Sequence, residues 1–352
     1  MAEPLLLYGA TGFTGKLILN RALSVGLRPV LAGRDAARLR ALAEPLGLPW
    51  RSAAVTSPDQ LDRAFTDVRV VLNAAGPFAD TAVRIAEAAG RRGAHYLDVS
   101  GEVDVIEDLA TRHAIWRRQG VMVMPAVGFD VVPSDCLSVM MAQQLPGATR
   151  LRIGIAGLRL LSRGSAETLA REWGRGTRLR RGGQICTVPA GSMSHAFDFG
   201  DGPQTSLLVS WGDVASAFYS TGIPEIETYF KASPALQGAL GANRLVGGML
   251  AGPTVQQAIS AWHTVLPSGP SAAERARVAT VIVAEVERPD GQRRAARLRA
   301  GDSYEFTAAS AVVIATRVLA GEYVAGFQTP GRVFGPALLG AIGYGAVETL
   351  VA

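Results

Sequence analysis

The chain has 352 residues, of which 48% are hydrophobic and 18% are charged, and its formal net charge is +5. This length leaves room for two domains with sizeable cores, and the composition excludes a disordered chain. Of its 35 basic residues, all but Lys16 and Lys231 are arginine. Such a bias indicates a GC-rich genome rather than a nucleic-acid partner, because the densest arginine cluster, residues 171–181, lies in no RNA-binding motif.

Cysteine content and hydropathy predict a cytoplasmic protein. Cys136 and Cys186 offer at most one disulfide in a large chain, which favours a reducing compartment. The N-terminus shows no signal-peptide pattern, and no run of eighteen apolar residues lacks a charge. Residues 245–255 and 333–347 are apolar, and we expect them to pack in the core or at a homodimer seam rather than to insert stably into a membrane.

The first forty residues predict one βαβ unit. Apolar residues 5–8 lead into a glycine turn, a helical pattern over 15–24 and a second apolar run over 28–32. Glycines let a backbone approach a pyrophosphate, and the helix N-terminus directs free N–H groups at its charge. We therefore expect dinucleotide contacts from Gly9, Thr11, Gly12, Phe13, Thr14 and Gly15.

The end of the second predicted strand indicates which dinucleotide binds. Sites that prefer NAD usually place a carboxylate there, whereas this chain has Gly33 and Arg34, with Arg38 one helical turn further on. A guanidinium suits the 2′-phosphate of NADP(H). Asp35 offers the alternative of a ribose contact, but we interpret it as the N-cap of a helix over 36–46. The pattern favours NADP(H) over NAD.

Strands and helices continue to alternate as far as residue 135, which predicts an α/β fold with a doubly wound parallel Rossmann sheet. Further strands are expected at residues 49–54, 68–73, 95–99 and 121–126. Further helices are expected at residues 57–65, 80–90 and 103–118. We assign residues 1–135 to this dinucleotide-binding domain.

The carboxyl ends of parallel strands line the ligand crevice, so the residues after each strand are candidates for the site. The small residues after the strand at 68–73 are expected to let the nicotinamide half of the cofactor pass. The candidate cofactor contacts here are the strand's last residue and the four that follow it: Asn73, Ala74, Ala75, Gly76 and Pro77. The next strand contributes Tyr96, a candidate proton donor, and Asp98, which is either a structural acceptor or a ligand of the ribose or a substrate amine. Ser100 and Gly101 follow as further candidate cofactor contacts.

The last strand of this domain leads into Gly128, Phe129 and Asp130. Gly128 is expected to permit close approach to the cofactor, and Phe129 to pack against a ring. Asp130 is a second candidate proton donor. Ser134 and Asp135 are interpreted as the start of the next helix.

After residue 136 the rhythm changes to paired strands, which predicts a second, α+β domain over 136–330 with a mixed or antiparallel sheet. Strands are expected at 151–156, 206–211, 278–288 and 293–299, the last two joined by a turn at Pro289-Asp290-Gly291. A helix is expected over 305–319. Residues 331–352 form an apolar segment that we expect to return to the first domain.

Two residues of this second domain are candidates for chemistry. Arg163 lies at a turn rich in hydroxyl groups and either anchors a substrate carboxylate or phosphate or precedes a capped helix. Tyr219 is a third candidate proton donor. The four histidines and two cysteines show no metal-ligand spacing, so no metal site is predicted.

Several of these motifs occur together, in order, in one known family. Gly9-Ala-Thr-Gly-Phe-Thr-Gly15, Asn73-Ala-Ala-Gly-Pro-Phe78, Tyr96-Leu-Asp-Val-Ser-Gly-Glu102 and Gly128-Phe-Asp-Val-Val-Pro-Ser-Asp135 are four of them. The chain resembles saccharopine dehydrogenase-like oxidoreductases, and most of all the branch that contains trans-acting enoyl reductases. The resemblance implies a Rossmann domain, NADP(H) and a second domain that closes over the nicotinamide.

The resemblance also implies reduction of a C=C or C=N bond in a small-molecule or carrier-bound substrate, of polyketide, lipid-like or other secondary-metabolite type, in a bacterium. Apolar, glycine-rich segments favour such a substrate over an amino diacid, which needs several converging basic anchors. A saccharopine-type imine reductase and a non-catalytic NADP-binding scaffold remain alternative hypotheses.

Overall fold

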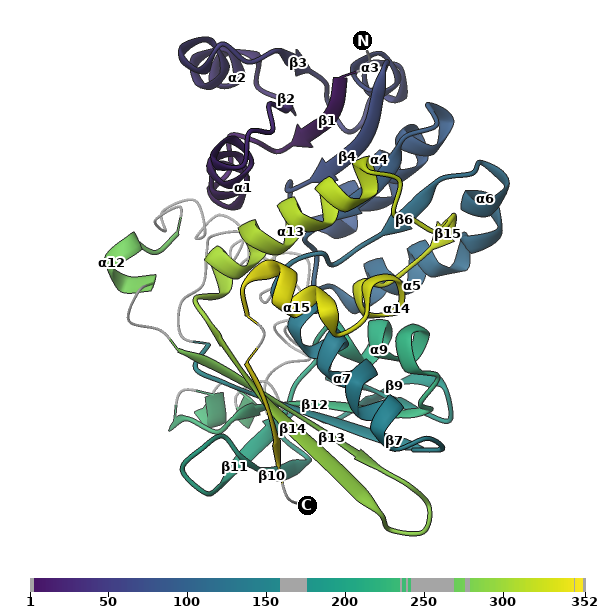
Figure 1. Ribbon diagram of the computed structural model, residues 1–352, viewed down its shortest axis with the longest axis vertical. Coiled ribbons are helices and arrows are strands. Elements are labelled where there is room, and N and C mark those ends of the chain that lie inside the picture. The colour runs from purple at the N-terminus through teal and green to yellow at the C-terminus, as the bar shows by residue number, and fades with distance from the viewer. Residues whose placement is uncertain are drawn as a thin grey trace. The chain divides into compact units, whose positions relative to one another are not determined.

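The computed structural model describes residues 3–158, 176–234, 236–238, 240–241, 269–275, 279–344 and 346–350. Arg163 and residues 245–255 lie outside these ranges. The chain divides into two compact units, which Figure 1 traces by residue number. Unit 1 comprises Met1–Val132 and Tyr304–Val333, and unit 2 comprises Pro133–Ser303 and Phe334–Ala352.

This division corrects the predicted domain limits at the C-terminal end. The expected boundary at residue 135 falls close to the observed break after Val132, but residues 304–333 belong to unit 1 rather than to the second domain. Conversely, the residues from Phe334 onward belong to unit 2 and do not return to the first. Apolar patterning shows that these segments are buried, but it does not tell which of two sheets they pack against.

Unit 1 contains a seven-stranded sheet in the order β15-β6-β5-β4-β1-β2-β3, and every neighbouring pair is parallel. Its strands are β1 (Glu3–Tyr8), β2 (Val30–Gly33), β3 (Trp50–Ser52), β4 (Val68–Asn73), β5 (His95–Asp98), β6 (Met122–Met124) and β15 (Gly326–Phe327). The described residues of β1, β2 and β5 are all buried, as expected of strands covered on both faces. The predicted Rossmann-type parallel sheet is confirmed.

The helices of unit 1 follow the predicted rhythm with one difference. They are α1 (Phe13–Ser24), α2 (Ala36–Ala43) with the short 3₁₀ turn η1 (Glu44–Leu46), α3 (Pro58–Ala64), α4 (Phe78–Arg91), α5 (Val103–Thr111), α6 (His113–Arg118) and α13 (Ser303–Leu319). The helix predicted over 103–118 is thus two helices, α5 and α6, separated by Arg112. The side chain of Asp35 accepts the Arg38 N–H at 3.0 Å and caps α2, as predicted.

Unit 2 contains a nine-stranded mixed sheet whose main path runs β10-β11-β12-β7-β13-β14-β16, with β8 joined to β12 and β9. Its strands are β7 (Arg150–Ala156), β8 (Thr177–Arg181), β9 (Gln184–Val188), β10 (Ser194–Asp198), β11 (Pro203–Leu208), β12 (Glu225–Lys231), β13 (Thr280–Glu287), β14 (Arg293–Gly301) and β16 (Val347–Leu350). The predicted hairpin at residues 289–291 joins β13 to β14. The strand predicted over 206–211 lies about three residues too late.

The helices of unit 2 are α7 (Val132–Gln144), α9 (Asp213–Thr221), α12 (Ala272–Arg275) and α15 (Ala337–Ile342), whereas α14 (Pro330–Phe334) lies at the end of the second segment of unit 1. The described part of the arginine-rich segment that ends at residue 181 forms strand β8. Arg180 is only 3% exposed, and its guanidinium donates to the carbonyls of Val214 and Gly183. A run of arginines therefore does not imply exposure when backbone carbonyls are available as partners.

The sheet of unit 2 curls so that β10 lies over its centre. Phe197 of β10 packs directly on Gly154 of β7, where an added Cβ would come within 2.6 Å of the ring. Phe197, Leu179, Leu208, Tyr229 and Val283 form the enclosed apolar cluster between these strands. The curl is possible because Gly154 carries no side chain at the point of closest approach.

Candidate functional site in unit 1

The glycine turn after β1 has a different steric requirement at each glycine. Gly9 has φ +83°, and a Cβ there would lie 2.8 Å from the backbone of Ala74 and Ala75. A Cβ on Gly15 would lie 2.3 Å from the Gly9 carbonyl oxygen, so Gly15 lets α1 pack on the turn. Gly12 is exposed and is less crowded, with only the Gly9 oxygen, at 3.3 Å, near an added Cβ. Gly12 is therefore the glycine at which a ligand can approach the protein backbone closely.

The N-terminus of α1 suits an anionic group. Gly12 is the N-cap residue, no side chain caps the helix, and no acidic residue stands in its first turn. The first N–H groups of α1 are thus available to a phosphate, which the helix dipole also favours. Thr11, Phe13 and Thr14 are half-buried around this end, and the Phe13 ring packs edge-on against Tyr304 of α13 with centroids 5.1 Å apart. The predicted pyrophosphate contacts thus fit the local structure.

Arg34 stands exposed at the end of β2, beyond the buried Gly33. Its charge acts on Tyr8: burial raises the pKa of the Tyr8 hydroxyl, and Arg34 opposes that rise. Asp35 is engaged as the helix cap, so the carboxylate that could have bound a ribose 2′-OH is directed at the backbone of α2 instead. A guanidinium without a competing carboxylate is the arrangement that suits a 2′-phosphate.

Asn73 shapes the loop after β4 rather than presenting its amide to a ligand. Its side chain is fully buried; it accepts the Ala75 N–H at 2.9 Å and donates to the Tyr96 hydroxyl at 3.1 Å. The loop continues through Gly76, which is exposed, and a cis peptide bond to Pro77. Ala74, Ala75 and Pro77 are half-buried along this loop. Their predicted contact with the cofactor stays a prediction.

Tyr96 is corrected from a candidate proton donor to a structural residue. It is fully buried, and its hydroxyl donates to Asp98 at 2.8 Å. Burial and the Asp98 charge raise the pKa of Tyr96 far above its ordinary value. Asp98 is also fully buried and accepts the N–H groups of Ser100 and Ala126, both at 2.9 Å. Asp98 is therefore the structural acceptor of the two alternatives, and it joins the loops after β5 and β6.

Asp130 and Glu102 place two carboxyl groups at the carboxyl edge of this sheet. Glu102 accepts the N–H groups of Phe78 and Ala79, at 3.0 and 2.9 Å, and so caps helix α4. Asp130 is half-buried against Gly101, where an added Cβ would lie 2.6 Å from Asp130 Oδ2. Burial, followed by the Glu102 charge, raises the pKa of Asp130 to about 7. A carboxyl group with this pKa can donate and regain a proton near neutral pH.

Gly128 and Phe129 serve helix α13 rather than the cofactor. A Cβ on Gly128 would lie 3.0 Å from Thr307 Cγ2, so the glycine allows α13 to approach this loop. Phe129 is 2% exposed, and the ring that it packs against is that of Phe306, edge-on at 5.7 Å. Sequence reasoning missed α13 here because the helix arrives from a segment more than 170 residues later.

Tyr219, Ser134 and Asp135 all lie in unit 2. Tyr219 is half-buried on α9, beside the Phe218 ring at 5.5 Å and near the Arg180 guanidinium. Ser134, expected to cap the next helix, lies inside the first turn of α7 instead and donates to Asp213 of α9 at 2.6 Å. Asp135 likewise accepts the Ser220 hydroxyl of α9. These two bonds hold α7 to α9.

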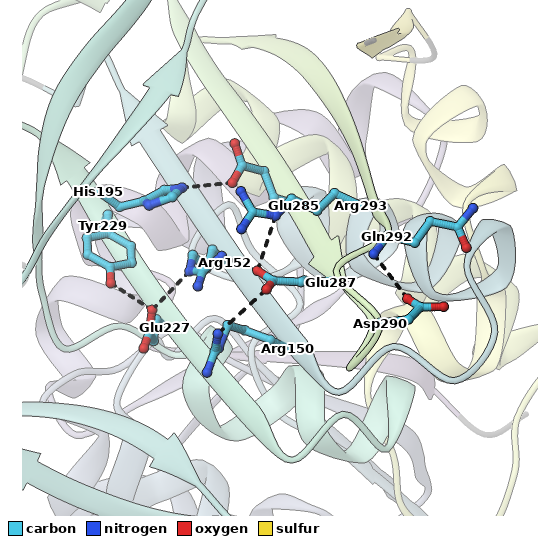
Figure 2. Close-up of polar contacts among 10 residues, drawn as sticks. All are labelled: Arg150, Arg152, His195, Glu227, Tyr229, Glu285, Glu287, Asp290, Gln292 and Arg293. Atoms are coloured by element: carbon cyan, nitrogen blue, oxygen red, sulfur yellow. Dashed lines mark hydrogen bonds and ion pairs between the residues drawn. The ribbon is translucent and has the colours of Figure 1, made fainter. Parts of the chain in front are cut away.

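A second polar cluster, which sequence reasoning did not identify, lies on the curled sheet of unit 2 (Figure 2). Arg152 of β7 lies between Glu287 at 2.9 Å and Glu227 at 3.4 Å, and the Tyr229 hydroxyl donates to Glu227. His195 of β10 meets Glu285 of β13 at 2.8 Å, although three strands separate β10 from β13 in the sheet. The alternation of charged residues along β12 and β13 is the sequence signal that marks this face.

This cluster is charge-compensated, which favours a structural role. The hydrogen bond from Arg152 is the main cause that lowers the pKa of Glu287, and Arg152, Arg293 and Arg150 contribute their charges. Each carboxylate drawn in Figure 2 on β12 or β13 has an arginine, histidine or tyrosine partner. Such paired groups fix the curl of the sheet.

Comparison with known proteins bears on the loops just described. Residues 9–121 match a family model described as NAD(P)H-binding. This part of the chain is an NAD(P)H-binding domain. It contains the glycine turn, Arg34 and the loops after β4 and β5, whereas Asp130 and α13 lie beyond the matched residues.

Two curated relatives of the chain are named as an oxidoreductase and a reductase. The chain is 31% identical over 157 residues to a probable mitochondrial saccharopine dehydrogenase-like oxidoreductase of Arabidopsis thaliana, a segment covering 40% of this chain and 35% of the relative. It is 36% identical over 139 residues to a trans-acting enoyl reductase of Mycobacterium leprae, covering 37% and 33%. The chain thus spans about a third of the length of the curated relatives it matches.

One solved structure shares the architecture of the whole chain. Apo saccharopine dehydrogenase (L-Glu forming) from Saccharomyces cerevisiae aligns with a TM-score of 0.62, covering 99% of this chain and 100% of that one, at 14% sequence identity. At this identity the likeness concerns the fold. It confirms the predicted combination of a parallel Rossmann sheet with a second, mixed-sheet domain.

Two further findings concern the described residues only. None of their helices has both the length and the apolar character that a membrane crossing requires. Within the same ranges, no group of three or more His, Cys, Asp and Glu side chains is arranged to hold a metal ion.

Proposed function

We propose that this protein is an NADPH-dependent reductase that acts on a C=C or C=N bond of a polyketide-like, lipid-like or other secondary-metabolite substrate, free or carrier-bound. The observation that carries the proposal is the uncapped, acid-free N-terminus of α1 next to an exposed Arg34, while Asp35 is engaged as a helix cap. The similarity to saccharopine dehydrogenase-like oxidoreductases and trans-acting enoyl reductases supports this reaction class.

The roles of the residues follow from their positions. Gly12 and the first N–H groups of α1 bind the pyrophosphate, and Arg34 binds the 2′-phosphate. Bound NADPH supplies a hydride to one carbon of the double bond. The protonated Asp130 carboxyl donates a proton to the other atom of that bond and then regains one from solvent, which its pKa of about 7 permits near neutrality.

Calorimetric titration with NADPH and, separately, NADH tests the cofactor preference. We expect NADPH to bind more tightly, and Arg34→Ala to abolish the difference. Arg40→Ala is the matched control, because Arg40 of α2 is also exposed, pairs with Glu44 of η1, and its removal changes the net charge equally. Equal binding of both nucleotides by the unmodified protein would contradict the proposal, and binding of neither would favour the scaffold hypothesis.

A further inference from the structure

Helix α13 holds the loop that carries Asp130. The Thr307 Oγ1 atom accepts the N–H of Phe129, the residue just before Asp130, at 3.0 Å. One turn further along the helix, the Ser310 hydroxyl donates to the Val127 carbonyl at 2.7 Å. The four residues that make these bonds are all buried: Thr307, Phe129, Ser310 and Val127. Two consecutive polar contacts from one helix therefore fix the backbone that leads into Asp130.

Steric contacts leave this loop little freedom to choose another conformation. Gly128 lies against the Thr307 methyl group, and the Phe129 ring lies edge-on against Phe306. On the opposite side, Asp98 accepts the Ala126 N–H, and Ala126 adopts a positive φ of +58°, which is uncommon for a residue with a Cβ. The loop is thus held between the end of β5 and helix α13.

We propose that Thr307 is a positioning residue: by accepting the Phe129 N–H, it fixes the peptide that precedes Asp130 and so holds the Asp130 carboxyl against Gly101 and beside Glu102. This inference rests on the proposed function, in which Asp130 donates the proton. Phe129 is 2% exposed, so without Thr307 its N–H is buried with no acceptor. A buried unsatisfied N–H is costly enough to drive the peptide to rotate toward another acceptor. Rotation there turns the Asp130 side chain away from Glu102.

The test compares Thr307→Val, which keeps the shape and loses the acceptor, with Thr307→Ser, which keeps the hydroxyl. In the full-length protein, ¹³C NMR follows the titration of the Asp130 carboxyl. We expect Thr307→Val to lower the titration midpoint by about one pH unit or more, toward the value of a solvated carboxyl, because the contacts that raise it are lost. We expect Thr307→Ser to restore the midpoint of the unmodified protein. Thr316→Val is the control, because Thr316 lies on the same helix and its hydroxyl donates to the Val312 carbonyl of that helix.

An Asp130 midpoint in Thr307→Val equal to that of the unmodified protein overturns the positioning role. If Thr307→Val does not fold, Ser310→Ala tests the same attachment at Val127, and an unshifted midpoint in that variant overturns the inference equally. NADPH affinity should change less than about twofold in all of these variants, since none touches the glycine turn. Failure of the proposed function is a separate result: it is shown by Asp130→Asn retaining full turnover, whatever the titration gives.

Discussion

At the scale of single residues, burial assigns different roles to polar side chains that a sequence presents as equivalent candidates. Tyr96 has both hydrogen-bonding directions of its hydroxyl occupied, by Asn73 and Asp98, and no exposed surface. Asp130 has no hydrogen-bond partner among the described residues and keeps part of its surface exposed. Of the candidates in unit 1, Asp130 is therefore the one that can exchange a proton with a ligand.

Asp130→Asn is expected to lower the turnover of NADPH oxidation by about 10²-fold or more, the usual contribution of a general acid, with little effect on NADPH binding. Stability gives a second readout. The pKa of Asp130 is about 7 in the folded state, above the ordinary value near 3.9, so the folded state loses stability as pH rises from about 4 to about 7. The variant should therefore melt at a higher temperature than the unmodified protein at pH 8, but not at pH 4. A pH-independent difference in a calorimetric series would contradict this account.

At the scale of elements, side chains from one loop stabilise the ends of another element. Glu102 follows β5, yet it caps α4 through the N–H groups of Phe78 and Ala79. In unit 2, Arg152 joins β7 to both of its neighbours through Glu227 on β12 and Glu287 on β13. Removing the side chain of Glu102 or of Arg152 should therefore lower the free energy of unfolding by more than the propensity of its own loop or strand suggests.

Glu102→Gln is expected to destabilise the protein by about 1–2 kcal/mol, since it weakens two charge-assisted bonds at a helix N-terminus. Urea unfolding at pH 7 measures the change. Glu87→Gln is the control, because Glu87 lies near the other end of α4 and its contact to Arg112 is long, at 3.6 Å. The control should change the free energy of unfolding by less than about 0.5 kcal/mol. Equal effects of the two substitutions would show that the cap is not what stabilises α4.

Arg152→Met is expected to cost about 3 kcal/mol, because it leaves Glu227 and Glu287 largely buried without their shared cation. The loss should shrink as pH falls through the depressed pKa of Glu287, where that carboxylate becomes protonated in the unmodified protein too. Chemical denaturation at pH 7 and pH 4 measures both effects. Arg294→Met, at an exposed position on β14, provides the comparison and should be nearly neutral.

Features that depend on residues close together in the chain could be predicted from the sequence. The six N-terminal strands, the cap at Asp35 and the hairpin at 289–291 each follow from local patterns and are confirmed. The roles of Gly128 and Tyr96 depend on partners that only the fold brings close. Gly128 makes room for Thr307, and the buried Tyr96 hydroxyl bonds to Asn73 and Asp98. The His195–Glu285 contact depends on the curl of a sheet, which no local pattern specifies.

At the scale of the whole molecule, the unit that carries the glycine turn is discontinuous in sequence. Its sheet is completed by β15, and its site is bordered by α13, both of which follow the first segment of unit 2, Pro133–Ser303, along the chain. The residues that contact α13 include Phe13 in the glycine turn and Phe129 beside Asp130. Ligand binding at the turn should therefore stabilise both parts of unit 1.

Hydrogen–deuterium exchange with saturating NADPH should thus slow exchange in residues 304–319 as well as in residues 9–34. At one hundred times the dissociation constant, binding adds about 2.7 kcal/mol to the stability of the folded state. Arg34→Ala, measured at the same NADPH concentration, should show weaker protection in both segments together. Protection confined to residues 9–34 would mean that α13 is not coupled to the cofactor site.

The late arrival of α13 and β15 has a consequence for how the chain folds as it leaves the ribosome. Once β6 has emerged, residues 133–303 must still be synthesised before α13 and β15 follow. At roughly 5–20 residues per second, this takes on the order of 10 to 30 s. During this interval the outer edge of β6 has no partner strand, and the Phe129 N–H and the Val127 carbonyl lack the Thr307 and Ser310 side chains that bond them in the folded protein. The nascent chain therefore presents an open sheet edge to chaperones until β15 is made.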